Sequence, residues 1–149
     1  MQHLDTDYVE RLIQRIGSIP PGASPRWGQL RRETLIEPLV WSIRHAMGRS
    51  RKVPFFGPPL PTPLLKPIFL RPPPPPPRNP QLPRQFTDQG ITLRENGDIE
   101  TLHALLEEYL SLVQADELDP APHPVFGPMS IDDWDRFHLR HFEHHCKQF

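Results

Sequence analysis

Proline is concentrated in one internal stretch, and this stretch limits what the chain can fold into. Most of the 22 prolines lie between Pro54 and Pro83. Each proline lacks a backbone N–H and restricts the residue before it, so residues 54–83 cannot form a helix or a central strand. We therefore expect a loop or polyproline II structure here, with regular structure on either side of it. Because 149 residues are too few for two domains of ordinary size, this segment is a connection within a single domain, residues 1–149.

The two halves of the proline-rich segment differ in character. Residues 55–70 include large apolar side chains, which a free linker would be expected to avoid, so we expect this half to pack on the domain surface. The run from Pro72 to Pro77 is predicted to be an exposed polyproline II rod. The simpler interpretation of the rod is a spacer, and the alternative is a segment that docks into an aromatic-lined groove of a partner protein.

Four stretches outside this segment repeat apolar residues at intervals of three and four, which is typical of amphipathic helices. They cover residues 5–18, 33–48, 97–115 and 130–148. Asp5 or Thr6 caps the first stretch, and Thr34 with Glu37 has the spacing of a capping box at the second. Residues 90–96 could form one short extended piece, which has no partner for a sheet. The chain is therefore expected to be all-α, as a four-helix bundle with a long connection between helices two and three.

The bulk properties exclude several kinds of partner. The formal net charge is −1, with 17 basic and 18 acidic residues, so no overall field attracts nucleic acid or anionic lipid. No apolar run is long enough to span a membrane, and the N-terminus has no signal-peptide core. The single cysteine, Cys146, excludes an intramolecular disulfide and is expected to be a small buried apolar group. These features predict a cytoplasmic protein.

Histidines lie on the apolar side of the last predicted helix. Ser130 and Asp133 have the spacing of an N-cap pair, so the helix is expected to begin there. At about 100° per residue, its apolar face includes Ile131, Trp134, Phe142, Cys146 and Phe149 together with His138, His141 and His145. His141 and His145 are four residues apart, which lets two imidazoles share one metal ion. The alternative is that they are buried neutral imidazoles that bond to neighbouring groups.

Three segments resemble a known family. The terminal HPVFGPMSIDDWDRFHLRHFEHHCKQF, the earlier PRWGQL, and FFGPPLPTPLLKP after the second helix are similar to the uncharacterised branch of the DinB/YfiT-like superfamily catalogued as domain of unknown function 1569. The resemblance runs in order over nearly the whole chain. It implies a DinB-like four-helix bundle, often a homodimer, of the kind proposed to hold a divalent metal through three histidines. His141 and His145 match the two ligands of the last helix.

The third ligand of that pattern is missing here, because Pro38 occupies its position on the second helix. A site with two histidines should bind zinc or nickel weakly unless another group completes it. His138 and Glu37 are the candidate substitutes, although Glu37 is also expected to act in the capping box. The remaining histidines are not expected to be ligands: His45 and His103 are predicted to lie at the surface or its boundary, and His123 to support the start of the last helix.

The sequence leaves two function classes open. In the first, the protein is a DinB-like bundle that keeps a partial metal site and acts as a binding or scaffold protein, as a homodimer or through the proline rod. In the second, it is a divalent-metal-dependent enzyme of the hydrolase or thiol-dependent transferase type. No nucleophile elbow, phosphate loop or recognisable cysteine–base pair supports the second class. We place the binding or scaffold protein first and the enzyme as the alternative.

Overall fold

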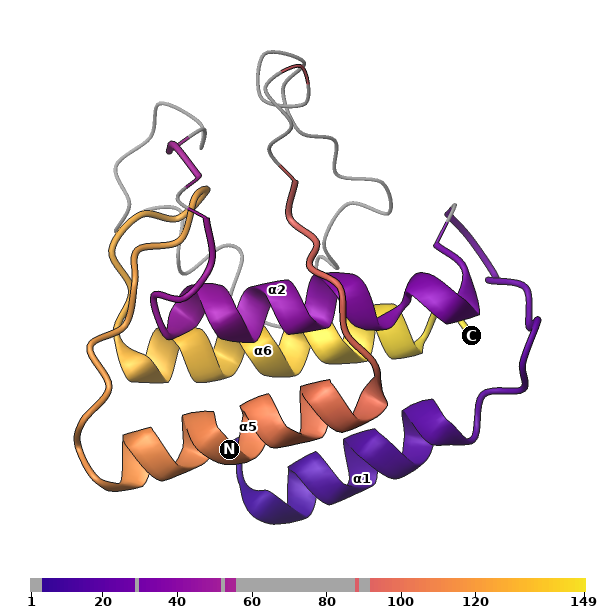
Figure 1. Ribbon diagram of the computed structural model, residues 1–149, viewed down its shortest axis with the longest axis horizontal. Helices are drawn as coiled ribbons and strands as arrows, with labels where there is room; N and C mark the ends of the chain where they lie inside the picture. Colours follow the sequence, from indigo (N-terminus) through magenta and orange to yellow (C-terminus); the bar gives the residue numbers. More distant parts are fainter. Residues whose placement is uncertain (1–3, 29, 52, 56–87, 89–91) are drawn as a thin grey trace.

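The computed structural model describes residues 4–28, 30–51, 53–55, 88 and 92–149 (Figure 1). Within this part of the chain, the regular elements are the helices α1 (Thr6–Gly17), η1 (Arg32–Thr34, a 3-10 turn), α2 (Ile36–Ala46), α5 (Ile99–Gln114) and α6 (Ile131–Cys146). The described residues contain no strand, and an isolated bridge pairs His123 with Gly127. The predicted all-α class is confirmed. Residues 92–96, the described part of the piece expected to be extended over 90–96, form no strand.

Two predictions about the proline-rich connection fall on residues that the structure does not describe. The exposed rod from Pro72 to Pro77 lies wholly outside the described residues. Of the apolar half, residues 55–70, only Phe55 is described, and it is 54% exposed. No described helix is long and apolar enough to cross a membrane.

Of the four α-helices named above, three begin at an N-cap residue whose side-chain oxygen accepts a backbone N–H of the first turn. The Asp5 carboxylate accepts from Tyr8 N at 2.7 Å, and Asp98 accepts from Thr101 N at 2.8 Å. At α6, Ser130 Oγ accepts from Asp133 N while Asp133 Oδ2 accepts from Ser130 N, both at 3.1 Å. This reciprocal pair is the capping box predicted from the sequence.

The predicted capping box of Thr34 and Glu37 is wrong. Thr34 ends the 3-10 turn, and its hydroxyl bonds back to the backbone of Arg31 at 3.2 Å, so it is not available to cap α2. The N-cap of α2 is Leu35, which makes no side-chain cap. Pro38 lies in the first turn of α2, where its missing N–H would have no partner within the helix.

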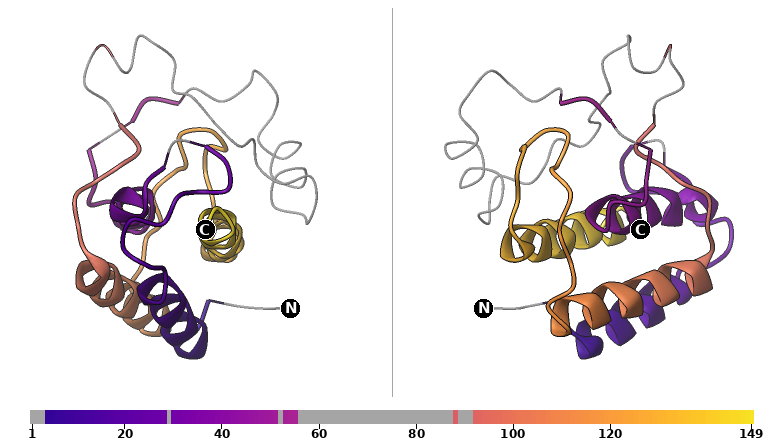
Figure 2. Two further views of the ribbon diagram at one scale, coloured as in Figure 1. Left: turned by 90° about the vertical axis from the view of Figure 1, so that its right-hand side faces the viewer. Right: turned by 60° about the vertical axis from the view of Figure 1, so that its left-hand side comes forward.

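The four α-helices form a ring in which α1 contacts α5, α5 contacts α2, α2 contacts α6, and α6 contacts α1. The end-on view in Figure 2 shows the same order. In Figure 1, α1 and α6 run in one direction, and α2 and α5 run in the other. Since α2 and α5 are parallel neighbours, the chain must return along the bundle before α5 can begin. This requirement excludes a tight turn between α2 and α5.

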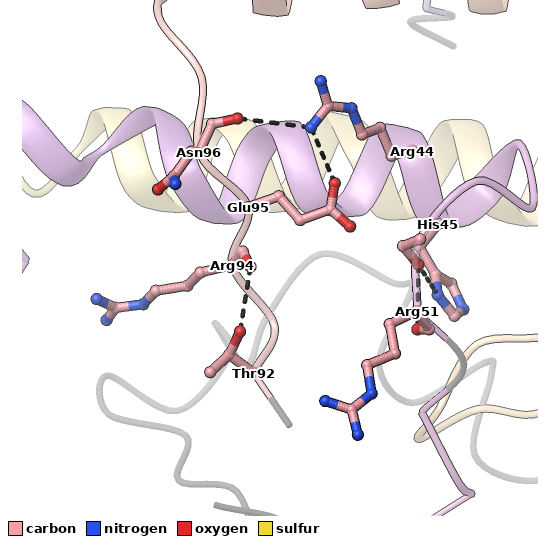
Figure 3. Close-up of polar contacts among 8 residues, drawn as sticks. Arg44, His45, Arg51, Thr92, Arg94, Glu95 and Asn96 are labelled. Atoms are coloured by element: carbon pink, nitrogen blue, oxygen red, sulfur yellow. Dashed lines mark hydrogen bonds and ion pairs between the residues drawn. The ribbon is translucent and has the colours of Figure 1, made fainter. Parts of the chain in front are cut away.

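The last part of that connection is anchored to α2 (Figure 3). Arg44 Nη1 lies 3.0 Å from Glu95 Oε2 and 3.5 Å from the carbonyl oxygen of Asn96. The backbone N–H of Glu95 also donates to the Glu37 carbonyl at 3.2 Å. A side chain at Gly97 would place its Cβ 3.0 Å from Val40 Cγ2, so glycine permits the close approach. These contacts fix where α5 starts relative to α2.

The largest fully buried side chains are those of Trp134, Tyr109 and Phe142. Trp134 Nε1 donates to the Ala121 carbonyl at 2.9 Å, and Tyr109 OH donates to Asp135 at 2.9 Å. Both polar ends are therefore satisfied while the rings remain in the core. Trp134, which the sequence places on the apolar face of the last helix, is therefore a core residue.

Candidate metal centre on the last helix

Two adjacent rows of side chains on α6 have different surroundings. The row Trp134, His138, Phe142 and Cys146 is buried in the bundle core. The neighbouring row Phe137, His141 and His145 is partly exposed. His141 stacks on Phe137, with ring centroids 5.1 Å apart and planes inclined by 24°. This second row places the two predicted metal ligands at the edge of the core.

The two imidazoles of His141 and His145 converge. Their Nε2 atoms are 3.0 Å apart, and the ring planes are inclined by 73°. Two nitrogens bound to one zinc at about 2.0–2.1 Å lie about 2.8 Å apart when the angle at the metal is about 90°, and about 3.4 Å apart at the tetrahedral angle. The observed separation of 3.0 Å lies between these values. The spacing of four residues therefore produces the convergence that the sequence predicts.

Gln148 determines which nitrogen of His145 carries the proton and which directs a lone pair toward His141. Gln148 is buried, and its Nε2 donates to the Trp27 carbonyl at 3.3 Å, which assigns Oε1 to the other side of the amide. Oε1 lies 2.7 Å from His145 Nδ1. Since an amide oxygen only accepts, Nδ1 carries the proton and Nε2 presents a lone pair toward His141. Metal-binding histidines are commonly oriented in this way by a neighbouring acceptor.

One nitrogen of His141 has no hydrogen-bond partner. Its Nδ1 is buried and makes no bond within the described residues. If His141 carries its proton on Nε2, that proton bonds His145 but the lone pair on Nδ1 stays unpaired. If the proton is on Nδ1, two lone pairs face each other across 3.0 Å. A cation between the two Nε2 atoms would remove this repulsion, so the pair is suited to a metal ion.

The surroundings also keep both imidazoles neutral. Burial lowers the pKa of His141 well below its usual value, and the nearby His145 lowers it further. Burial lowers the pKa of His145 to about 4, with smaller contributions from the positive charges of His144 and Arg94, against a hydrogen bond to Gln148 that raises it. Metal ligation requires the neutral form of histidine, which is therefore the form present at neutral pH.

The structure does not bring His138 or Glu37 into a three-ligand group with this pair. His138 is fully buried, with its ring stacked on Trp134 and Phe142, and neither of its nitrogens has a hydrogen-bond partner among the described residues. Burial lowers its pKa to about 3. Pro38 is buried in the first turn of α2, at the end of the bundle where α6 finishes (Figure 1).

The prediction that His45 lies at the surface or its boundary is wrong, because His45 is buried. Its Nδ1 lies 2.8 Å from Ser50 Oγ, and its Nε2 lies 2.8 Å from the Pro122 carbonyl oxygen. The residues before α6 cover the end of α2, and this long-range contact is not visible in the periodicity of α2 itself. With both nitrogens occupied, His45 has a structural role.

His123 supports the start of α6, as predicted. Its Nδ1 accepts from the backbone N–H of Val125 at 2.9 Å and of Phe126 at 3.3 Å. Its ring packs against Phe126 and Phe137. Burial lowers the pKa of His123 to about 3. The neutral ring thus holds the turn that leads into the helix bearing the histidine pair.

A second group of metal-ligating side chains lies between α1 and α5. The donor atoms of Glu10, His103 and Glu107 all lie within 4.8 Å of one another. His103 is partly exposed, as expected, but this group is not among the sites predicted from the sequence. The i,i+4 spacing of His103 and Glu107 was a visible signal. Glu10 could not be added without knowing that α1 packs beside α5.

Cys146 is a free thiol, and it is buried. Burial raises its pKa to about 11. A thiol in this protonated state is a poor nucleophile and metal ligand, so the predicted role as a small apolar group fits the structure.

Comparison with known proteins gives one match. The model of a family described as "Protein of unknown function (DUF1569)" matches residues 47–149, which is more than half of the chain and includes α5, α6 and the histidine pair. No curated protein and no solved structure gives a significant match. The chain therefore belongs to the DUF1569 family.

Proposed function

We propose that this protein binds a divalent transition metal, zinc or nickel, through His141 and His145, and that it acts as a binding or scaffold protein rather than as a catalyst. The observation that carries the proposal is the 3.0 Å separation of the two Nε2 atoms. The contact with Gln148 supports the proposal, because it leaves the lone pair of His145 Nε2 directed at the position that a metal ion shared with His141 would occupy.

The pair of histidines is an incomplete ligand set for a metal ion. A structural zinc site has four protein ligands and a catalytic one usually has three, whereas here two histidines converge. Affinity in the micromolar range or weaker is therefore expected. The resemblance to DinB-like bundles supports the same conclusion, because Pro38 stands where their third histidine is expected. Donor atoms from a partner protein or a second copy of the chain would complete the coordination.

The alternative is a metal-dependent enzyme, a hydrolase or a thiol-dependent transferase, and one observation favours it. His141 and His145 supply only two ligands, so a metal bound by them would keep coordination positions open for a small substrate. The chain supplies no thiolate of its own, since burial raises the pKa of Cys146 to about 11. A thiol-dependent reaction would need a thiol from solution.

Calorimetric titration of the untagged protein with Zn²⁺ and Ni²⁺ tests the proposal. We expect His141→Ala and His145→Ala each to remove one weakly bound metal per chain. His144→Ala is the matched control, because it removes a neighbouring imidazole of α6 that lies against Trp27 and outside the converging pair. Unchanged stoichiometry in both His141→Ala and His145→Ala would exclude the site.

The same preparations separate the two functions. A binding protein should show no turnover of a chromogenic ester, and no transfer of a small thiol to an electrophilic probe, after loading with metal. Metal-dependent turnover that disappears in His145→Ala and persists in His144→Ala would establish the enzyme instead.

A further inference from the structure

The group of Glu10, His103 and Glu107 joins two helices that are distant in the sequence. His103 Nε2 lies 2.9 Å from Glu10 Oε1 on α1 and 3.2 Å from Glu107 Oε1, one turn further along α5. The three side chains are 50%, 32% and 63% exposed, in the order Glu10, His103 and Glu107. The group is therefore open to ions from solution, yet its donor atoms already point toward one another.

Within the described residues, the carboxylates of Glu10 and Glu107 share one ion-pair partner, the imidazole of His103. Two carboxylates converge on one imidazole nitrogen, which carries at most one hydrogen for both. In the part of the chain that the structure describes, neither Glu10 nor Glu107 forms an ion pair with a lysine or arginine. By contrast, Glu108, the next residue of α5, pairs with Arg49. When His103 is neutral, the group has two negative charges and no cation. A divalent cation would neutralise it.

The donor set and its geometry suit a metal of the zinc class. One imidazole nitrogen and two carboxylate oxygens are three of the donors that zinc accepts, with bonds of about 2.0–2.2 Å. Donors bound to one such ion lie about 2.9–3.6 Å apart at angles of about 90–109°. The separations of 2.9 and 3.2 Å from His103 Nε2 to the two carboxylates are within this range.

We propose that Glu10, His103 and Glu107 form a second divalent-metal site, which takes zinc or a similar transition metal and links α1 to α5. The ligands come from both helices, so binding requires the packed bundle and stabilises it. This site is separate from the pair on α6 and does not depend on the function proposed for that pair.

The test starts from the double variant His141→Ala/His145→Ala, which lacks the α6 pair. Titrated with Zn²⁺ in metal-free buffer, it should bind one zinc per chain and show a higher melting temperature with zinc than without. Adding His103→Ala or Glu107→Gln should weaken binding at least about tenfold and abolish the thermal shift. Glu117→Gln is the control, since it removes an exposed carboxylate that lies beyond the end of α5.

The results discriminate between the two sites. Binding of zinc by the double variant, lost on adding His103→Ala and kept on adding Glu117→Gln, would establish the second site whatever happens at α6. A double variant that binds no zinc, or that binds it equally well with His103→Ala, would overturn the proposal. If circular dichroism shows that the double variant is unfolded, the test is made in the parent protein instead. His103→Ala alone should then lower the number of zinc ions bound per chain by one, and an unchanged number would refute the site.

Discussion

Gln148 Oε1 lies 2.7 Å from His145 Nδ1, and this contact sets the direction of the His145 lone pair. Replacing Gln148 with Ala should therefore weaken metal binding by the α6 pair by about 10–100-fold, the usual effect of removing a group that orients a ligand histidine. Calorimetry in the His103→Ala background would measure this site alone. Gln114→Ala, at the exposed end of α5, is the control. Equal affinities for both variants would show that Gln148 does not orient the ligand.

Replacing Pro38 with His should restore a third ligand. Pro38 is buried at the end of α2 that adjoins the end of α6. A four-ligand zinc site in a small domain has a binding free energy of about 10–16 kcal/mol, so one added ligand should contribute about 3 kcal/mol. Pro38→Ala separates the effect of the ligand from that of removing a proline. Equal zinc affinity in Pro38→His and Pro38→Ala would contradict this expectation.

Acid should destabilise the protein through its buried histidines. Burial lowers the pKa of His123 and His138 to about 3 and that of His145 to about 4, whereas an unfolded histidine titrates at about 6.5. Between these values the unfolded chain binds more protons than the folded protein, so the free energy of unfolding falls as the pH falls. Above about pH 6.5 this stabilisation is complete. Urea titrations from pH 7.5 to 4 should show the decline.

His138→Phe should reduce this pH dependence. The aromatic ring preserves the stack with Trp134 and Phe142, while two buried nitrogens without partners are removed. The free energy of unfolding at pH 7 should be unchanged or higher by about 1 kcal/mol, and its slope against pH below 6 should be smaller. A large loss of stability at pH 7, or a slope equal to that of the parent, would mean that His138 has a polar partner in solution.

Trp134→Ala should be among the most destabilising single substitutions. Trp134 is fully buried, and its Nε1 donates to the Ala121 carbonyl, so the change leaves both a cavity and an unpaired acceptor. The expected loss is about 3–5 kcal/mol in the free energy of unfolding, measured by urea denaturation in metal-free buffer. Trp27 is partly exposed, so Trp27→Ala should lower the free energy of unfolding by clearly less. Similar losses for both would conflict with the packing described for Trp134.

Local sequence patterns predicted the four helices and the approach of His141 to His145. The side chains of Asp5 and Ser130 accept N–H groups three residues away, and His141 contacts His145 one helical turn along. The helix caps and the histidine contact therefore each depend on a short stretch of chain. The error at Thr34 is also local, because its hydroxyl can bond either backward to Arg31 or forward into a helix, and the backward bond forms.

The features that the sequence did not reveal depend on which helices become neighbours. His45 is buried because residues 121 and 122, far along the chain, cover the end of α2. Glu10 contacts His103 because α1 packs beside α5. Helical periodicity gives the face that each helix buries, but it does not give the order of the helices around the bundle.

The parallel arrangement of α2 and α5 has a consequence for the rate of folding. Contacts such as Arg44 with Glu95 join residues 51 positions apart, whereas neighbouring helices in an up-and-down bundle are joined by short loops. The connecting chain must close this large loop before the contacts between α2 and α5 can form, which costs conformational entropy early in folding. The bundle should therefore fold more slowly than an up-and-down bundle of similar length and stability.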